Sequence, residues 1–99
     1  MQFTIDTIYT FKLTSGEEIV AKVVQVQDNT IIISEPVSVV QSQQGIGLLP
    51  TFFTADPSKK PLLNINNIML SSPTDASVSA KYIEATSGIK IAPKKLILG

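Results

Sequence analysis

An alternation of apolar and polar side chains in residues 2–13 constrains the fold more than any other feature of this sequence. Except at residues 7 and 8, the apolar side chains fall on odd positions and the polar ones on even positions: Phe3, Ile5, Tyr9, Phe11 and Leu13 against Gln2, Thr4, Asp6, Thr10 and Lys12. A period of two, with β-branched and aromatic residues, is typical of a β-strand. The sequence therefore predicts either one long strand here or two strands with a break near Asp6.

Two further strands follow, each after a short turn. Residues 14–16 supply the first turn, and the valine-rich stretch 17–27 predicts the second strand. Residues 28–29 tolerate the positive φ that a type I′ hairpin turn needs. A third strand begins at Thr30, and Pro36 within it predicts a bend or bulge before the strand continues.

The middle of the chain leaves one strand open. Residues 42–47, SQQGIG, have the composition of a flexible loop, whereas residues 48–54, LLPTFFT, are apolar and extended. A second loop, residues 55–61, precedes residues 62–70, LLNINNIML, which resume as strand. The fourth strand is formed by LLPTFFT, by PLLNI, or by both around a bulge between them.

Helix signals follow the strands. Ser72 is a candidate N-cap, Pro73 fits the first helical position and Asp75 completes a capping box. Gly88 suits the position after the helix end. The predicted apolar stripe along this helix is narrow and contains Val78, Tyr82, Ile83 and Ala85. The tail, residues 89–99, is predicted to add an edge strand or to dock on a neighbour.

Strands first and one helix last indicate a mainly β fold, a small, strongly bent antiparallel barrel of five strands with a C-terminal helix. A length of 99 residues predicts one barrel domain, residues 1–71, with residues 72–99 as a helix and tail packed on or beside it. Hydrophobic residues make up 43% of the chain and charged residues 16%. Apolar surface beyond a small core makes an oligomer interface plausible.

The sequence lacks several side chains that enzymes commonly use for catalysis. It has no histidine and no cysteine, which removes the usual general base, the thiol nucleophile and thiolate metal ligands. The adjacent Glu17 and Glu18 would point to opposite faces of a strand and so cannot share a site. A lone G-x-G at residues 45–47 lacks the third glycine of a dinucleotide-binding fingerprint. We expect no enzyme activity, no catalytic residues, no metal and no cofactor.

Charge and hydropathy limit the partners. The formal net charge is +0 and all 8 cations are lysines. Nucleic-acid binders usually carry a basic excess, because phosphate contacts supply most of the affinity, so neutrality counts against a strong binder. The N-terminus lacks the features of a signal peptide, and no apolar run approaches the ~18 residues of a membrane helix. We expect a cytoplasmic protein with no membrane partner.

Two side-chain pairs have a simple and a functional interpretation. Phe52 and Phe53 could form a base-stacking platform, but such a pair more often places one ring in the core and the other in an interface. Lys59 and Lys60 could contact phosphate, but such a pair is more often a solvated loop tip. The sequence favours the simple interpretation for both pairs.

Residues 11–37, FKLTSGEEIVAKVVQVQDNTIIISEPV, resemble the first motif of the Sm and Sm-like proteins, a family that includes bacterial RNA chaperones. In that motif a strand ends in leucine-x-x-glycine, which Leu13 and Gly16 match. A bent strand with a small central residue follows, and Ala21 stands where the family usually has glycine. Residues 63–70, LNINNIML, resemble the second motif, in which a tight loop joins two apolar strands.

The resemblance implies a strongly bent, SH3-like or OB-like open barrel that forms a homo-oligomeric ring, commonly of five to seven subunits. The fourth strand of one subunit pairs with the fifth strand of the next, which removes exposed strand edges. The chain is also similar to the Sm-like proteins of bacteriophages of marine bacteria, which carry an added C-terminal helix and would act in the host cytoplasm. The implied interface residues are Phe52, Phe53, Ile68, Met69 and Leu70.

Rings of this family bind single-stranded, often uridine-rich or adenosine-rich RNA through two loops that meet at the pore, some acting as RNA chaperones. The first loop maps to Asp28 and Asn29 of this chain, and the second to Asn64, Asn66 and Asn67. Asparagine also tolerates left-handed backbone conformations. The second loop is therefore also predicted to turn the chain between the last two strands.

Two departures from the family motifs keep other functions open. The second loop normally carries arginine, which supplies phosphate contacts and stacking that asparagine cannot, and this chain has no arginine. The first loop lacks the family's hydrophobic stacking residue before the asparagine. One alternative is a structural or protein-interaction ring that has lost RNA binding and presents its C-terminal helix to a protein partner. Another is an oligonucleotide-binding barrel that works as a monomer.

Overall fold

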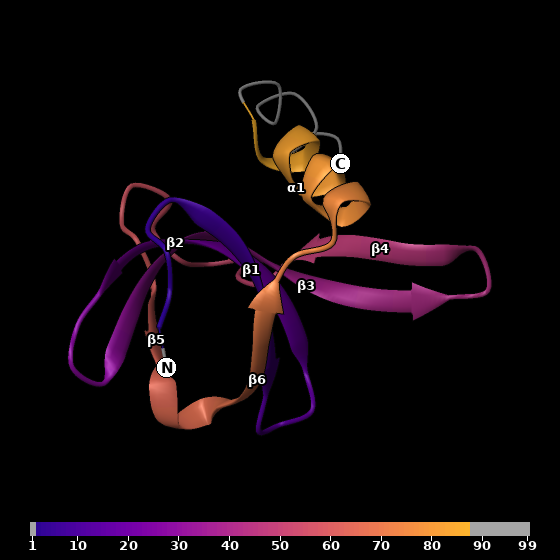
Figure 1. Cartoon of the computed structure of the whole chain (residues 1–99). Helices are drawn as coiled ribbons and strands as arrows, with labels where there is room; N and C mark the ends of the chain where they lie inside the picture. Colours follow the sequence, from indigo (N-terminus) through magenta and orange to yellow (C-terminus); the bar gives the residue numbers. More distant parts are fainter. Residues whose placement is uncertain (1, 88–99) are drawn as a thin grey trace.

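The computed structural model describes residues 2–87, and these form a bent antiparallel sheet that does not close, followed by one helix (Figure 1). The strands are β1 (Thr7–Leu13), β2 (Glu18–Val26), β3 (Thr30–Ser42), β4 (Gly45–Pro50), β5 (Leu62–Asn64) and β6 (Ile68–Pro73). A 3₁₀ turn, η1 (Ile65–Asn67), joins β5 to β6, and the helix α1 spans Ala76–Thr86. The predicted mainly β fold with a C-terminal helix is confirmed.

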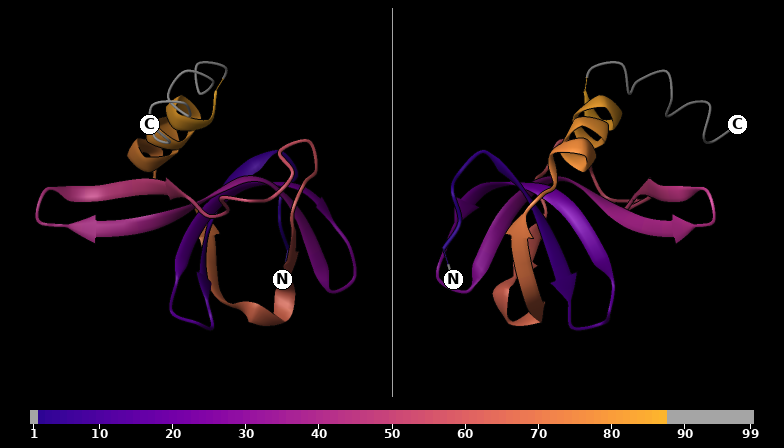
Figure 2. Two further views of the ribbon diagram at one scale, coloured as in Figure 1. Left: turned by 180° about the vertical axis from the view of Figure 1, so that it is seen from behind. Right: turned by 45° about the vertical axis from the view of Figure 1, so that its right-hand side comes forward.

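The sheet has the strand order β4-β3-β2-β1-β6, and β5 also pairs with β3. Because β3 is 13 residues long, two strands can pair along its edge opposite β2. Its first three residues pair with β5, and residues 37–42 pair with β4. The far half of β3 and β4 extend from the bent part of the sheet as an arm (Figure 2).

The predicted fourth strand is therefore two strands, β4 and β5, separated by the loop of residues 51–61, so the 6-stranded sheet has one strand more than expected. The loop predicted at residues 42–47 is wrong in part, because Gly45 and Gly47 belong to β4. Gly45, directly after the turn between β3 and β4, has φ of +117°. Gly47 lies close against Val40 on β3. Hairpin pairing with β3 thus outweighs the glycine content of this segment.

The predicted break near Asp6 is confirmed, but the residues before it form no strand, so neither one long strand nor two strands is correct. Asp6 has φ of 63° and β1 begins at Thr7. The backbone N–H of Asp6 donates to the carbonyl of Val23 over 2.7 Å. Phe3 can then fold back onto Tyr9, edge to face with ring centroids 5.0 Å apart.

A β-bulge marks the bend where β2 crosses β3. The register shifts at Ala21, so that Glu35 and Pro36 together lie opposite this one residue. Glu35 has φ of 52°, in the left-handed region that residues other than glycine rarely adopt. Ala21 is completely buried. The predicted bend or bulge at Pro36 is confirmed.

Tyr82 on α1 reaches this bulge. Its hydroxyl donates to the carbonyl of Ser34 over 2.7 Å and accepts from the backbone N–H of Lys22 over 3.2 Å. The side chain is buried, and burial raises the pKa of Tyr82 to about 12. Of the predicted apolar stripe, Val78 also packs here, whereas Ile83 is 55% exposed. Tyr82 therefore anchors the helix to the sheet.

Two hydrophobic clusters result. The larger is enclosed by the bent sheet and consists of Tyr9, Phe11, Ile19, Ala21, Val23, Ile31, Ile33 and Ile68. The smaller lies under α1 and consists of Val20, Val37 and Tyr82. The helix thus covers a second, minor core on the other face of β2 and β3.

The helix begins later than predicted. Ser72 and Pro73 pair with β1, so β6 continues through both. The N-cap is Asp75, whose carboxylate accepts from the backbone N–H of Ser77 over 3.1 Å. The prediction of Ser72 as N-cap and Pro73 as first helical residue is therefore wrong. The predicted helix end at Gly88 and the tail after it lie outside the described residues.

Candidate functional site

The two loops that the sequence singles out lie side by side. Residues 27–29 join β2 to β3, and residues 65–67 join β5 to β6. Neither Asp28 nor Asn29 has a positive φ, so the predicted type I′ turn is wrong. Because β5 pairs with the start of β3, Thr30 is opposite Asn64. The backbone N–H of Ile65 donates to the carbonyl of Asn29 over 3.0 Å. One end of the sheet thus gathers both loops, which we call the asparagine loops.

The asparagine loops are exposed and held by their own hydrogen bonds. The side chains of Asp28, Asn29, Asn64, Asn66 and Asn67 are all exposed. The amide oxygen of Asn64 accepts from the backbone N–H of Asn66 over 2.8 Å and so caps η1. The carbonyl of Asn67 accepts from the backbone N–H of Thr14 over 2.8 Å. Asn66 and Asn67 turn the chain as predicted, but they do so within the 3₁₀ turn η1 and not in a left-handed conformation.

The chemistry of these loops suits neutral polar groups better than phosphate. An amide side chain offers both a donor and an acceptor, which is the pattern that base edges present. The loops contain no lysine, and Asp28 adds a negative charge. Four exposed amides without a cation can read bases but contribute little to phosphate binding.

The five residues implied for a subunit interface lie in three environments. Met69 and Leu70 are exposed on β6, Ile68 is buried, and Phe52 and Phe53 lie in a loop that is described below. Met69 and Leu70 lie on β6 at one end of the strand order and are 57% and 65% exposed. Ile68 is only 7% exposed and belongs to the core of its own chain, so its side chain offers little to a neighbour. The register shift between Lys12 and Leu13 makes Met69 the extra residue of a bulge.

Leu62 on β5 is an exposed apolar residue that the sequence analysis missed. Its side chain is 68% exposed, whereas that of Leu63 packs against the main core. The period of two within a strand could have separated them, once β5 was known to begin at residue 62. Leu62 and Met69 therefore place exposed apolar side chains on two different strands.

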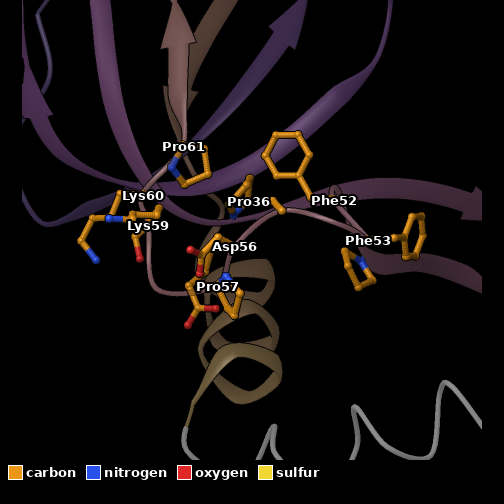
Figure 3. A pocket seen from close by; sticks show the side chains of 12 residues that line it. Pro36, Phe52, Phe53, Asp56, Pro57, Lys59, Lys60 and Pro61 are labelled. Carbon is orange, nitrogen blue, oxygen red and sulfur yellow. The ribbon is translucent and has the colours of Figure 1, made fainter.

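Phe52 and Phe53 lie in the loop of residues 51–61 and not on a strand. They are 51% and 80% exposed, so the prediction that one ring enters the core is wrong. The rings of Phe3, Tyr9 and Phe11 already fill that core. The phenylalanines instead line a hollow of about 490 Å³ together with Lys59 and Lys60 (Figure 3).

Among residues 2–87, no three side chains of histidine, cysteine, aspartate or glutamate gather as metal ligands. Within the same residues, no helix is both long and apolar enough to cross a membrane.

No family model matches the chain, and no curated protein sequence matches it.

Proposed function

We propose that this chain is a ring-forming, Sm-like subunit that binds single-stranded RNA with its asparagine loops. The observation that carries the proposal is the contact between Asn29 and Ile65, which joins the two loops that the family motifs assign to RNA. The strand order, with a 3₁₀ turn between two short strands, supports the same family.

Exposed strand edges support self-assembly. Among residues 2–87, β6 ends the strand order and β5 pairs only with the first three residues of β3. Unpaired edges with apolar side chains tend to associate, and those of β5 and β6 carry Leu62, Met69 and Leu70. Pairing of β5 in one copy with β6 in the next is a head-to-tail contact, which forms a ring when the rotation between successive copies closes. Phe52 and Phe53 lie outside these edges and are not needed for it.

The RNA proposal predicts a loss of affinity when amides are removed. In the double variant Asn29→Ala, Asn66→Ala, RNA should bind about tenfold more weakly, from two lost hydrogen bonds of about 0.5–1.5 kcal/mol each. Fluorescence anisotropy with labelled uridine-rich and adenosine-rich oligomers measures this. Asn64 stays unchanged because it caps η1.

A matched control removes two exposed amides at the far end of the arm, Gln43→Ala and Gln44→Ala. This control should bind RNA as the native chain does. Increasing salt should weaken the RNA affinity of both the native chain and the control, since phosphate contacts release counterions. A native chain that binds no RNA at low salt would refute the RNA function, and equal affinity of all three proteins would refute RNA binding by the asparagine loops.

A protein-interaction ring is the second candidate, and the absence of a cation from the asparagine loops favours it. In that case α1 would present Ile83 and its exposed neighbours to a protein partner. Affinity purification that recovers RNA and no protein would count against this candidate. A single-subunit mass in solution would instead favour a monomeric oligonucleotide-binding barrel.

A further inference from the structure

The loop of residues 51–61 is held in place at several points. It begins beside the bulge of β3, where the backbone N–H of Thr51 donates to the carbonyl of Pro36 over 3.3 Å. It ends on the same strand, where the N–H of Ile33 donates to the carbonyl of Pro61 over 3.0 Å. Its two ends thus flank the bulge, and the hollow lies between the loop and β3. A fixed loop costs less entropy on binding.

Asp56 shapes the tip of this loop. Its carboxylate accepts from the backbone N–H and the hydroxyl of Ser58 over 2.9 and 2.8 Å. These hydrogen bonds hold the pKa of Asp56 below its ordinary value, so the group is ionised at neutral pH. The carbonyl of Asp56 also accepts from the backbone N–H of Lys59 over 3.1 Å. The lysine pair therefore follows a fixed turn.

The hollow is aromatic on one side and basic on the other. Figure 3 shows Phe52 and Phe53 on one side and Lys59 and Lys60 on the other, with Pro61 between them. Exposed aromatic faces stack nucleic-acid bases, and adjacent lysines contact the phosphate that follows a base. Glu35 and Asp56 also line the hollow, so its formal charge is balanced and stacking has to supply most of the affinity.

We propose that this hollow is a second binding site for single-stranded nucleic acid, in which a base stacks on the phenylalanine rings and the backbone phosphates lie against Lys59 and Lys60. The site goes beyond the proposed function, because it is separate from the asparagine loops. Strand β5, 3 residues long, connects the two sites. That distance is about 10 Å of extended chain, so one nucleic-acid strand can contact both sites.

Short RNA oligomers containing 2-aminopurine test the site, because stacking on an aromatic ring quenches their fluorescence. The double variant Phe52→Ala, Phe53→Ala should lose the quenching and bind roughly five- to a hundredfold more weakly. The double variant Lys59→Ala, Lys60→Ala should lower the slope of log affinity against log salt by about 1.4, or about 0.7 for each lost phosphate contact. Circular dichroism checks that both variants are folded.

Matched controls remove similar side chains elsewhere. Leu49→Ala removes an exposed apolar side chain from β4, and Lys81→Ala removes an exposed lysine from α1. Both controls should keep the quenching and the salt slope. Unchanged quenching and affinity in the phenylalanine variant would overturn the site. A fall in oligomer mass in that variant, with unchanged affinity per subunit, would also overturn it and would mean that a second copy covers the rings.

The asparagine variant separates this site from the proposed function. If Asn29→Ala, Asn66→Ala binds normally while the phenylalanine variant does not, the hollow is a nucleic-acid site and the asparagine loops are not. If only the asparagine variant binds weakly, the hollow is not a site and the proposed function stands.

Discussion

At the scale of single residues, Tyr82 has the clearest structural role. Its hydroxyl bonds to backbone groups of both β2 and β3 beside the bulge, where the regular ladder is interrupted. The apolar stripe of the helix includes Tyr82, so its burial could be predicted from the sequence. Its partners, Lys22 and Ser34, could not, because they are far away along the chain and depend on the register of the bulge.

Removing this hydroxyl should destabilise the fold. Tyr82→Phe leaves a partly buried carbonyl and a partly buried N–H without their partner, so we expect the free energy of unfolding to fall by about 1–3 kcal/mol. Urea denaturation at fixed protein concentration measures the difference. Thr7→Ser on the half-buried start of β1 is a conservative control that should change little. Equal stability of Tyr82→Phe and the native chain would contradict the role of the bridge.

The pKa of Tyr82 predicts how stability depends on alkaline pH. Burial raises this pKa from 10.0 to about 12, so the folded chain holds the proton more tightly than the unfolded chain. The contribution of the protonated Tyr82 hydroxyl to folding stability is fully present below pH 10 and is lost as the pH rises from 10 to about 12. Denaturation across this range should show a fall in stability that is smaller in Tyr82→Phe. Parallel curves of unfolding free energy against pH for the two proteins would contradict a raised pKa of Tyr82.

At the scale of elements, the bulge in β3 decides how the sheet bends. Pro36 and the small Ala21 predict a bend here, but the left-handed conformation falls on Glu35. Glu35→Gly should be more stable than Glu35→Ala by about 1 kcal/mol, since both lose the same charge and only glycine adopts a positive φ without strain. Thermal unfolding of the two variants measures this difference. An alanine variant as stable as the glycine variant would mean that the bulge is unstrained.

The strands and turns differ in how far local sequence determines them. Alternation predicts β1, and β-branched apolar content predicts β2 and β3, which are buried on both faces. The start of α1 could not be predicted, because pairing with β1 retains Ser72 and Pro73 in β6. The adjacency of the asparagine loops is expected only from the resemblance to the Sm-like proteins, whereas the hollow depends on a loop whose path no local pattern specifies.

At the scale of the whole molecule, the sheet is open and leaves much apolar surface uncovered. The exposed large apolar side chains include Phe53 at 80%, Leu62 at 68% and Leu70 at 65%. A high apolar content predicts this excess, but only the pairing of strands shows where it lies. Residues 36–55 carry no charge at all, so β4 and its arm lack the lysines that usually protect an edge strand.

The mass of the chain in solution tests the central claim, that free strand edges join copies of this protein into a ring. Native mass spectrometry should give five to seven times the 10.7 kDa of one chain. Met69→Glu and Leu62→Glu should each shift the mass towards a single chain, because a charge on either edge opposes pairing. Ile83→Glu on α1, at a side chain of similar exposure, should leave the ring intact. A native chain that stays monomeric at every concentration would contradict the ring, and the asparagine loops would then have to act alone.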